Sequence, residues 1–155
     1  MKLTITFVIL ASILMSCQEN KDGDATKRSP TFLVGTWKLI TAMVIDKSDT
    51  LITDYTKNKS FIKIINDTHF AFLQHDLKKG KDSAAVFVAG GGSYFLSGNL
   101  YTEHLEYCSD RNWEGNDFKF TIDVKNDTLI QSGVEKVASA GVDRTNIEKY
   151  IRVKK

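Results

Sequence analysis

The sequence predicts an all-β fold, an antiparallel up-and-down barrel of about eight strands preceded by a signal peptide. Short segments rich in β-branched and aromatic residues recur along the chain, while helical periodicity is hard to find. Tight turns such as Asn-Asp and Ser-Gly-Asn separate many of these segments, as expected for consecutive hairpins. A meander of this kind leaves exposed edges, and closure into a barrel removes them.

The first segment is an apolar run, Leu3–Met15, that follows the positive Lys2. Its length is that of a signal-peptide core and falls short of the ~20 residues that a membrane-spanning helix needs. The run ends in Leu14-Met15-Ser16-Cys17, which resembles the bacterial lipobox. The resemblance implies that the Cys17 thiol receives a diacylglyceryl group and that cleavage makes Cys17 the new N-terminus. Residues 1–16 are therefore expected to be a lipoprotein signal peptide.

Residues 17–31 read as a flexible tether, because the stretch is mostly charged or small and cannot bury enough surface to fold. Glu19, Asp22 and Asp24 resemble the acidic export signal of Bacteroidetes-type surface lipoproteins. The expected location is the cell envelope, lipid-anchored at the outer membrane, with the periplasmic face and the cell surface both open. The expected partner is the membrane, through the lipid on Cys17.

Residues 32–155 are expected to form one domain, long enough for a real core. Loss of Lys2 lowers the formal charge from +2 to +1, and no basic cluster with interleaved aromatics is present. This excludes nucleic acid as an expected partner. If Cys17 is acylated, Cys108 has no disulfide partner, so the stability must come from packing. No cofactor is predicted.

Alternation is clearest in "FKFTIDV", where Phe118 and Phe120 share one face with Ile122. The glycine-rich "AGGGS" at 89–93 predicts a bulge or bend. Residues 136–146 are expected to form a loop with at most a turn of helix. The predicted strands are Gly35–Ile45, Ser60–Ile65, Thr68–Gln74, Ala84–Ala89, Gly92–Leu96, Leu100–Cys108, Asp117–Val124, Thr128–Gln131 and Ile147–Val153.

The first strand contains Gly35-Thr36-Trp37, which resembles the G-x-W motif of lipocalins and related calycin barrels. In that family the tryptophan closes one end of the barrel under a basic residue of the last strand, which implies Arg152 here. A guanidinium over an indole contributes about 0.5–2 kcal/mol. The resemblance thus implies that Gly35, Trp37 and Arg152 are barrel-closing residues.

A more specific likeness covers most of the domain and is to the lipocalin-like domains of Bacteroidetes lipoproteins. It implies a lipocalin-like β-barrel, although the helix that usually lies beside a lipocalin barrel is not visible in the sequence. The matching stretches are "GTWKL", "GGSYFLSGNLYTEHLEYCS", "GNDFKFTIDVKNDTLIQSG" and "EKYIRV".

The densest polar stretch is "YTEHLEYC", where alternation puts Tyr101, Glu103 and Tyr107 on the more apolar face, with Leu105. We expect this face to point inward and to bind a ligand, with Phe118 and Phe120 lining the same site. A buried Glu103 must be paired, hydrogen-bonded or neutral. It either anchors the polar end of a ligand or pairs with an internal arginine or tyrosine.

The other face of this strand carries His104, Glu106 and Cys108, which is a conceivable metal site together with His69 or His75. Ordinary solvent-facing polar residues explain the same pattern. Cys108 and His104 lie two apart on a strand, ~7 Å along it, too far for a nucleophile and its base. We therefore assign no metal ligand and no catalytic residue.

Three functions remain open at this point. The first is a binding module that holds a small apolar or amphipathic molecule inside the barrel. The second is a structural or protein-interaction module of the outer membrane with a filled barrel, and the third is an enzyme on the same scaffold. The volume of the barrel interior separates the first two.

Overall fold

A computed structural model describes residues 31–154 of the chain. The predicted signal peptide, Cys17 and nearly all of the predicted tether lie outside these residues. The elements in chain order are β1 (Gly35–Asp46), β2 (Asp49–Asp54), β3 (Lys59–Ile65), β4 (His69–Asp76), β5 (Phe87–Ser97), β6 (Leu100–Cys108), the short 3-10 helix η1 (Arg111–Trp113), β7 (Asp117–Lys125), β8 (Thr128–Val137), the short 3-10 helix η2 (Ala138–Ala140) and β9 (Val142–Arg152).

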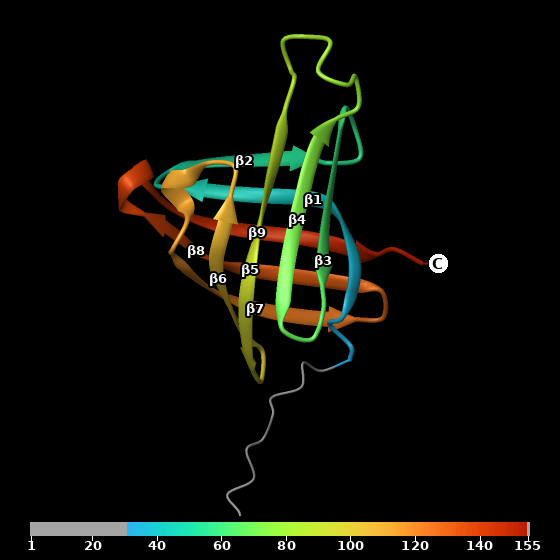
Figure 1. Cartoon of the computed structure of the whole chain (residues 1–155), viewed down its shortest axis with the longest axis vertical. Helices are drawn as coiled ribbons and strands as arrows, with labels where there is room; N and C mark the ends of the chain where they lie inside the picture. The colour runs from blue at the N-terminus through green and yellow to red at the C-terminus, as the bar shows by residue number, and fades with distance from the viewer. Residues whose placement is uncertain (1–30, 155) are drawn as a thin grey trace, which may run out of the picture.

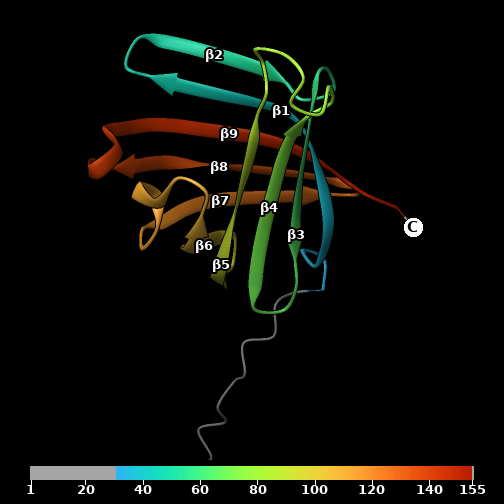
Figure 2. The same ribbon diagram turned by 45° about the horizontal axis from the view of Figure 1, so that its top comes forward.

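The strands form one antiparallel sheet that closes on itself (Figures 1 and 2). Strands β3 to β8 each pair with the next strand in sequence, and β1 pairs with both β3 and β9. The closing pair runs from Trp37 opposite Arg152 to Ile45 opposite Thr145. The predicted fold class, an all-β up-and-down barrel of eight strands, is therefore confirmed, with β2 as an additional strand.

Strand β2 was missing from the predicted strands and forms a hairpin with the second half of β1. The first part of β1, from Gly35 to Lys38, pairs with β3. From Thr41 onward the same edge of β1 pairs with β2 instead, so β2 continues the wall where β3 diverges (Figure 2). The sequence signal is weak because β2 is short, has an aspartate at each end and is mostly exposed.

Strand β5 is one continuous strand, whereas the sequence predicted two separated by the glycines. The extra residue of the predicted bulge lies on the partner strand: Gly91 faces Tyr107 and Gly92 faces Leu105, so Glu106 is unpaired. The backbones approach closely here, and a Cβ on Gly92 would lie 2.0 Å from the carbonyl oxygen of His104. Glycine is therefore required for this packing, and it does not interrupt the strand.

Residues 136–146 were predicted as a loop with at most a turn of helix; the short helix is present, but most of the predicted loop belongs to strands. Strand β8 runs to Val137, the turn is only the short η2, and β9 begins at Val142. The polar residues of this region suggested a loop because polar side chains are rare inside sheets. Here they are tolerated because Arg144 and Asn146 pair with Glu135 inside the barrel.

The hydrophobic core lies mainly at one end of the barrel, which we call the closed end. Trp37, Tyr101, Leu129 and Tyr150 are fully buried, and Leu33 covers them from the segment before β1. The opposite end, which we call the open end, carries η1, η2 and the long β4–β5 connection. No helix in the described residues is long and apolar enough to cross a membrane.

Candidate functional site: a polar cavity inside the barrel

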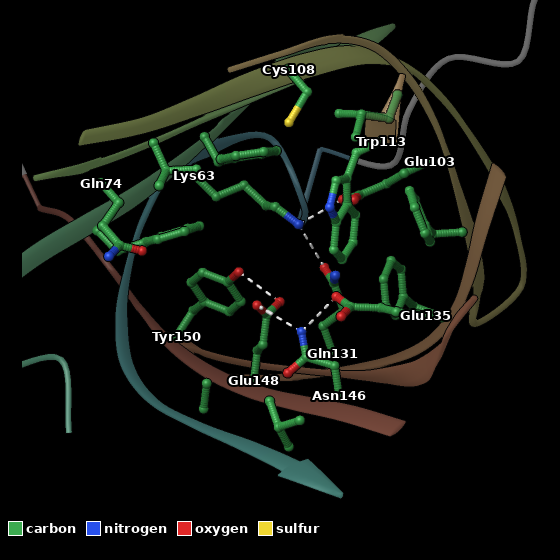
Figure 3. A pocket seen from close by; sticks show the side chains of 18 of the residues that line it. Lys63, Gln74, Glu103, Cys108, Trp113, Gln131, Glu135, Asn146, Glu148 and Tyr150 are labelled. Atoms are coloured by element: carbon green, nitrogen blue, oxygen red, sulfur yellow. Dashed lines mark hydrogen bonds and ion pairs between the residues drawn. The ribbon is translucent and has the colours of Figure 1, made fainter. Parts of the chain in front are cut away.

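The barrel contains a partly open cavity of about 370 Å³. Figure 3 shows that side chains from several strands point into it. The volume is within the ~300–1,000 Å³ range of small-molecule pockets. Its lining combines aromatic and aliphatic side chains with charged groups: Ala42, Val44, Tyr55, Phe61, Lys63, Phe72, Gln74, Val88, Glu103, Leu105, Cys108, Asp110, Trp113, Phe118, Phe120, Gln131, Glu135, Arg144, Asn146, Glu148 and Tyr150.

The deepest polar group is an ion pair between Lys63 of β3 and Glu103 of β6. The Lys63 Nζ atom donates to Glu103 Oε1 at 2.6 Å and to Gln131 Oε1 at 3.0 Å. Both charged side chains are almost completely buried, at 3% and 8% exposure. A buried pair survives desolvation only with such close geometry, and removal of one partner leaves an uncompensated charge. Glu103 therefore has an internal cation, although that cation is not one of the arginines considered from the sequence.

A second polar group joins β8 to β9. Arg144 Nε donates to Glu135 Oε2 at 2.7 Å, and Asn146 Nδ2 donates to Glu135 Oε1 at 2.8 Å. Glu135 is thus held on both carboxylate oxygens. The arginine is half-exposed and stacks over Trp113 of η1, with 5.4 Å between its guanidinium carbon and the ring centroid. Glu135, Arg144 and Asn146 thus line the cavity, and Arg144 also contacts η1 at the open end.

The third carboxylate is Glu148, which lies two residues after Asn146 on the same face of β9. Its oxygens accept hydrogen bonds from the Tyr150 hydroxyl at 2.8 Å and from Asn146 Nδ2 at 3.2 Å. Burial raises the pKa of Glu148, and the nearby positive charge of Lys63 and the Tyr150 hydroxyl offset this only in part. The part of Glu148 that stays accessible faces the cavity (Figure 3).

The apolar part of the lining consists mainly of aromatic rings. Phe61 stacks on Phe72 with centroids 5.8 Å apart, and Tyr55 meets Phe61 edge-on. On the other side, Trp113 contacts Phe118, also with centroids 5.8 Å apart. Rings of this kind give a ligand large contact area and geometric selectivity. The lining of the cavity therefore combines aromatic rings with charged side chains.

The residues of the G-x-W motif and Arg152 of the last strand lie together at the closed end. The guanidinium carbon of Arg152 lies 4.0 Å from the ring centroid of Trp37. Arg152 donates from Nη1 to the Val34 carbonyl at 2.7 Å and from Nη2 to the Phe32 carbonyl. Gly35 has a φ of 144° and lies against the same guanidinium, where a Cβ would be 2.7 Å from Nη1. These three residues meet at one end of the barrel.

Among the residues predicted to bind a ligand, Glu103, Phe118 and Phe120 line the cavity. Tyr101 is fully buried, yet it is not part of the lining; its ring contacts Tyr94 with centroids 5.0 Å apart. Its hydroxyl has no hydrogen-bond partner in the described chain. Tyr101 therefore belongs to the packed core next to the cavity.

The inward orientation predicted for Tyr107 is wrong, since this side chain is 69% exposed on the outside of the barrel. The cause is the bulge at Glu106, which shifts the alternation of β6 by one residue. Cys108, predicted to face solvent, lines the cavity instead. His104 remains outside and contacts Asp117 at 2.7 Å, so His104 and Cys108 are on opposite sides of the wall.

Sequence reasoning missed Lys63, Gln131, Glu135 and most of the polar lining on β9. A signal was present in β9, where Arg144, Asn146, Glu148 and Tyr150 alternate with other residues at strand spacing. Lys63 stands in an otherwise apolar strand and gave no indication of a distant partner. No group of three metal-ligating side chains occurs among residues 31–154.

Comparison with known proteins adds no assignment. No family model and no curated protein matches the chain significantly. The closed eight-stranded barrel is consistent with a calycin-like fold, and the function has to be argued from the cavity itself.

Proposed function

We propose that this protein is a lipid-anchored envelope lipoprotein whose lipocalin-like barrel binds a small apolar or amphipathic molecule. The observation that carries the proposal is the cavity of about 370 Å³ with its aromatic walls. A barrel that acts only as a scaffold has no need for internal space, and voids larger than a water molecule destabilise a core. The cavity thus supports binding over the alternative of a filled barrel that acts through its surface.

The polar lining also supports binding. Lys63, Glu103 and Glu148 are held inside the barrel although burial of charge is costly. Small-molecule sites combine an apolar lining with a few convergent polar groups that orient the ligand. No pair of the lining residues has the arrangement of a nucleophile with its base, so we propose binding and no reaction.

The test uses N-phenyl-1-naphthylamine, a neutral apolar dye whose fluorescence rises in an apolar site. The protein is the mature chain from residue 17 with Cys17→Ser, which cannot be acylated. We expect saturable fluorescence enhancement with one dye per barrel. The variant Ala42→Phe fills the cavity from β1 and abolishes the enhancement, whereas Thr121→Phe adds the same ring to the exposed face of β7 and leaves it unchanged.

Two results would reject the binding proposal. One is a wild-type chain that gives no saturable enhancement at any dye concentration below its solubility limit. The other is an Ala42→Phe variant that folds and binds the dye as well as the wild type does, because the dye then occupies a site outside the barrel.

The anchoring part of the proposal rests on Leu14-Met15-Ser16-Cys17 and the acidic tether, which lie outside the described residues. We expect the mature protein from its native host to begin at Cys17 and to carry a diacylglyceryl group. Intact-mass spectrometry measures this, and native mass spectrometry of the same sample also detects a retained small molecule. Cys17→Ser should abolish the lipid and membrane association, while Cys108→Ser should keep both. A mature chain that begins at Met1 without lipid would contradict the proposal.

A further inference from the structure

The charged groups of the cavity do not balance. Its lining has two cationic side chains, Lys63 and Arg144, and three glutamates inside the barrel, and the lining also includes the exposed Asp110. Lys63 pairs with Glu103, and Arg144 pairs with Glu135. In the described part of the chain no lysine or arginine forms an ion pair with Glu148. When the groups inside the barrel are ionised, they carry one excess negative charge, and Glu148 is the carboxylate among them without a cation; the exposed Asp110 adds a further negative charge to the lining.

Hydrogen-bond donors are also scarce at this position. Glu148 receives one hydrogen bond from Tyr150 and one from Asn146, while an ionised carboxylate has about four acceptor positions. Asn146 is only 6% exposed, and its Nδ2 already donates to Glu135. Its Oδ1 has no partner in the described chain. A further donor for Glu148 must therefore come from the cavity.

The surroundings of Glu148 suit a cation better than an anion. Tyr150 and the rings of Phe61 and Tyr55 form the adjacent wall, and aromatic faces attract positive charge. An anionic ligand would bring a fourth negative charge into an interior with two cations, both already paired. Like charges in a desolvated site are costly, whereas a ligand cation would neutralise the excess.

We propose that the barrel selects ligands with a positively charged nitrogen on an apolar or aromatic body, and that Glu148 is the group that accepts this nitrogen. The body of the ligand packs between the rings at Phe61 and those at Trp113, and its ammonium donates to the free side of the Glu148 carboxylate. This inference rests on the proposed function, because it names the chemical class of ligand for the same cavity.

The experiment is a competition at pH 8 between three probes that differ only in their polar end. 3-Phenylpropylamine, 3-phenylpropan-1-ol and 3-phenylpropionate displace N-phenyl-1-naphthylamine from the unacylated mature chain. We expect the amine to compete about tenfold better than the alcohol, since a charge-assisted hydrogen bond is roughly twice as strong as a neutral one. The carboxylate should be the weakest competitor.

Two variants then test the assignment to Glu148. Glu148→Gln keeps the shape and removes the charge, so the amine should compete no better than the alcohol. Asp143→Asn removes one negative charge from the exposed face of the same strand and should leave the ranking unchanged. The wild-type ranking alone decides the ligand class if Glu148→Gln does not fold.

The outcomes distinguish failure of the proposed binding function from failure of the proposed ligand class. If the dye does not bind to the wild type, the proposed function fails and the ligand class falls with it. If the dye binds but the alcohol or the carboxylate competes as well as the amine, the ligand class is wrong and the binding function stands. If the amine preference survives in Glu148→Gln, the charge is recognised elsewhere and the role of Glu148 is rejected.

Discussion

Both ends of the barrel place an arginine of β9 over a tryptophan, but the two contacts are built differently. At the closed end, Trp37 is fully buried, donates from Nε1 to the Leu33 carbonyl at 2.8 Å, and lies under Arg152. At the open end, Trp113 is half-buried on a three-residue helix, and Arg144 lies farther from its ring. The same pair of residue types thus occurs once inside a core and once at the edge of a cavity.

The difference lies in what else holds each arginine. Arg152 donates to two backbone carbonyls of the segment before β1, so it fixes main chain at positions distant in sequence. Arg144 pairs with the Glu135 side chain, and η1 is tied to η2 by one bond from Ser139 Oγ to the Asn112 carbonyl at 2.9 Å. We therefore expect the closed end to determine stability and the open end to determine access to the cavity.

The largest expected effect is on stability at the closed end. Trp37→Ala should lower the free energy of unfolding by about 3–5 kcal/mol, because it removes a fully buried ring and leaves a void. Trp113→Ala is the matched variant at the open end and should cost less than about 2 kcal/mol. Urea titrations followed by circular dichroism measure both values. Equal losses of unfolding free energy would contradict the expectation that the closed end determines stability.

Substitution of the arginine should also lower the free energy of unfolding more at the closed end than at the open end, but by a smaller amount than for the tryptophans. Arg152→Lys removes the planar group that stacks on Trp37 and donates to two carbonyls, so we expect a loss of about 1–3 kcal/mol. Arg144→Lys should cost less than about 1 kcal/mol, because the side chain is half-exposed and lysine can still pair with Glu135. The measurement is again the denaturation midpoint. A larger loss of stability in Arg144→Lys than in Arg152→Lys would contradict the expected order.

Ligand affinity should show the opposite pattern. Trp113→Ala removes a ring that lines the cavity, and we expect the dissociation constant for N-phenyl-1-naphthylamine to rise about fivefold, roughly 1 kcal/mol. Arg152→Lys lies at the other end and should leave this constant within about twofold. A fluorescence titration of each folded variant gives the comparison. Weaker binding in Arg152→Lys than in Trp113→Ala would contradict it.

The smallest expected effect concerns Glu148, which lies between the two ends. Burial raises its pKa above the ordinary value of 4.5, so the folded state binds its proton more tightly than the unfolded state does. The wild type therefore loses stability as the pH rises from the unfolded pKa through the folded one. Glu148→Gln lacks this loss, so it should unfold at a higher temperature than the wild type at pH 7. Near pH 4 the difference should be smallest.

Thermal unfolding at several pH values measures this, and Asp143→Asn serves as the exposed control on the same strand. A Glu148→Gln variant that is less stable than the wild type at pH 7 and equal at pH 4 would have the wrong sign. In that case the carboxylate stabilises the fold, and the cost of its burial is offset within the protein.

Local pattern predicted the barrel because each strand contains its own signal. The alternation of Phe118, Phe120 and Ile122 depends only on residues within β7, and these three side chains are buried as expected. The Trp37 and Arg152 contact was expected from a resemblance to other barrels. The first prediction needs no knowledge of how distant strands are placed relative to each other, and for the second the resemblance supplied that placement.

The polar site was mostly invisible because its pairs are not local. Lys63 and Glu103 are 40 residues apart, and Lys63 and Gln131 are 68 apart. Tyr107 was misplaced because a single bulge at Glu106 reverses the alternation, and its cause is the close approach of glycines on another strand. Pairings of this kind depend on the closed sheet, which periodicity within one strand does not encode.

The contacts of Arg152 also have a consequence for the order in which the chain folds. Its bonds to Val34 and Phe32 span 118 and 120 residues, so the first and last strands meet only when nearly the whole domain is present. Contacts of such sequence separation carry a large loop-closure cost and make folding slow, on the order of milliseconds to seconds for all-β domains. We expect the hairpins from β3 to β8 to form earlier and the junction of β1 with β9 to form last. A chain that ends before β9 would then be a curled sheet in which β1 and β8 each leave an edge unpaired, and such edges promote association between copies of the chain.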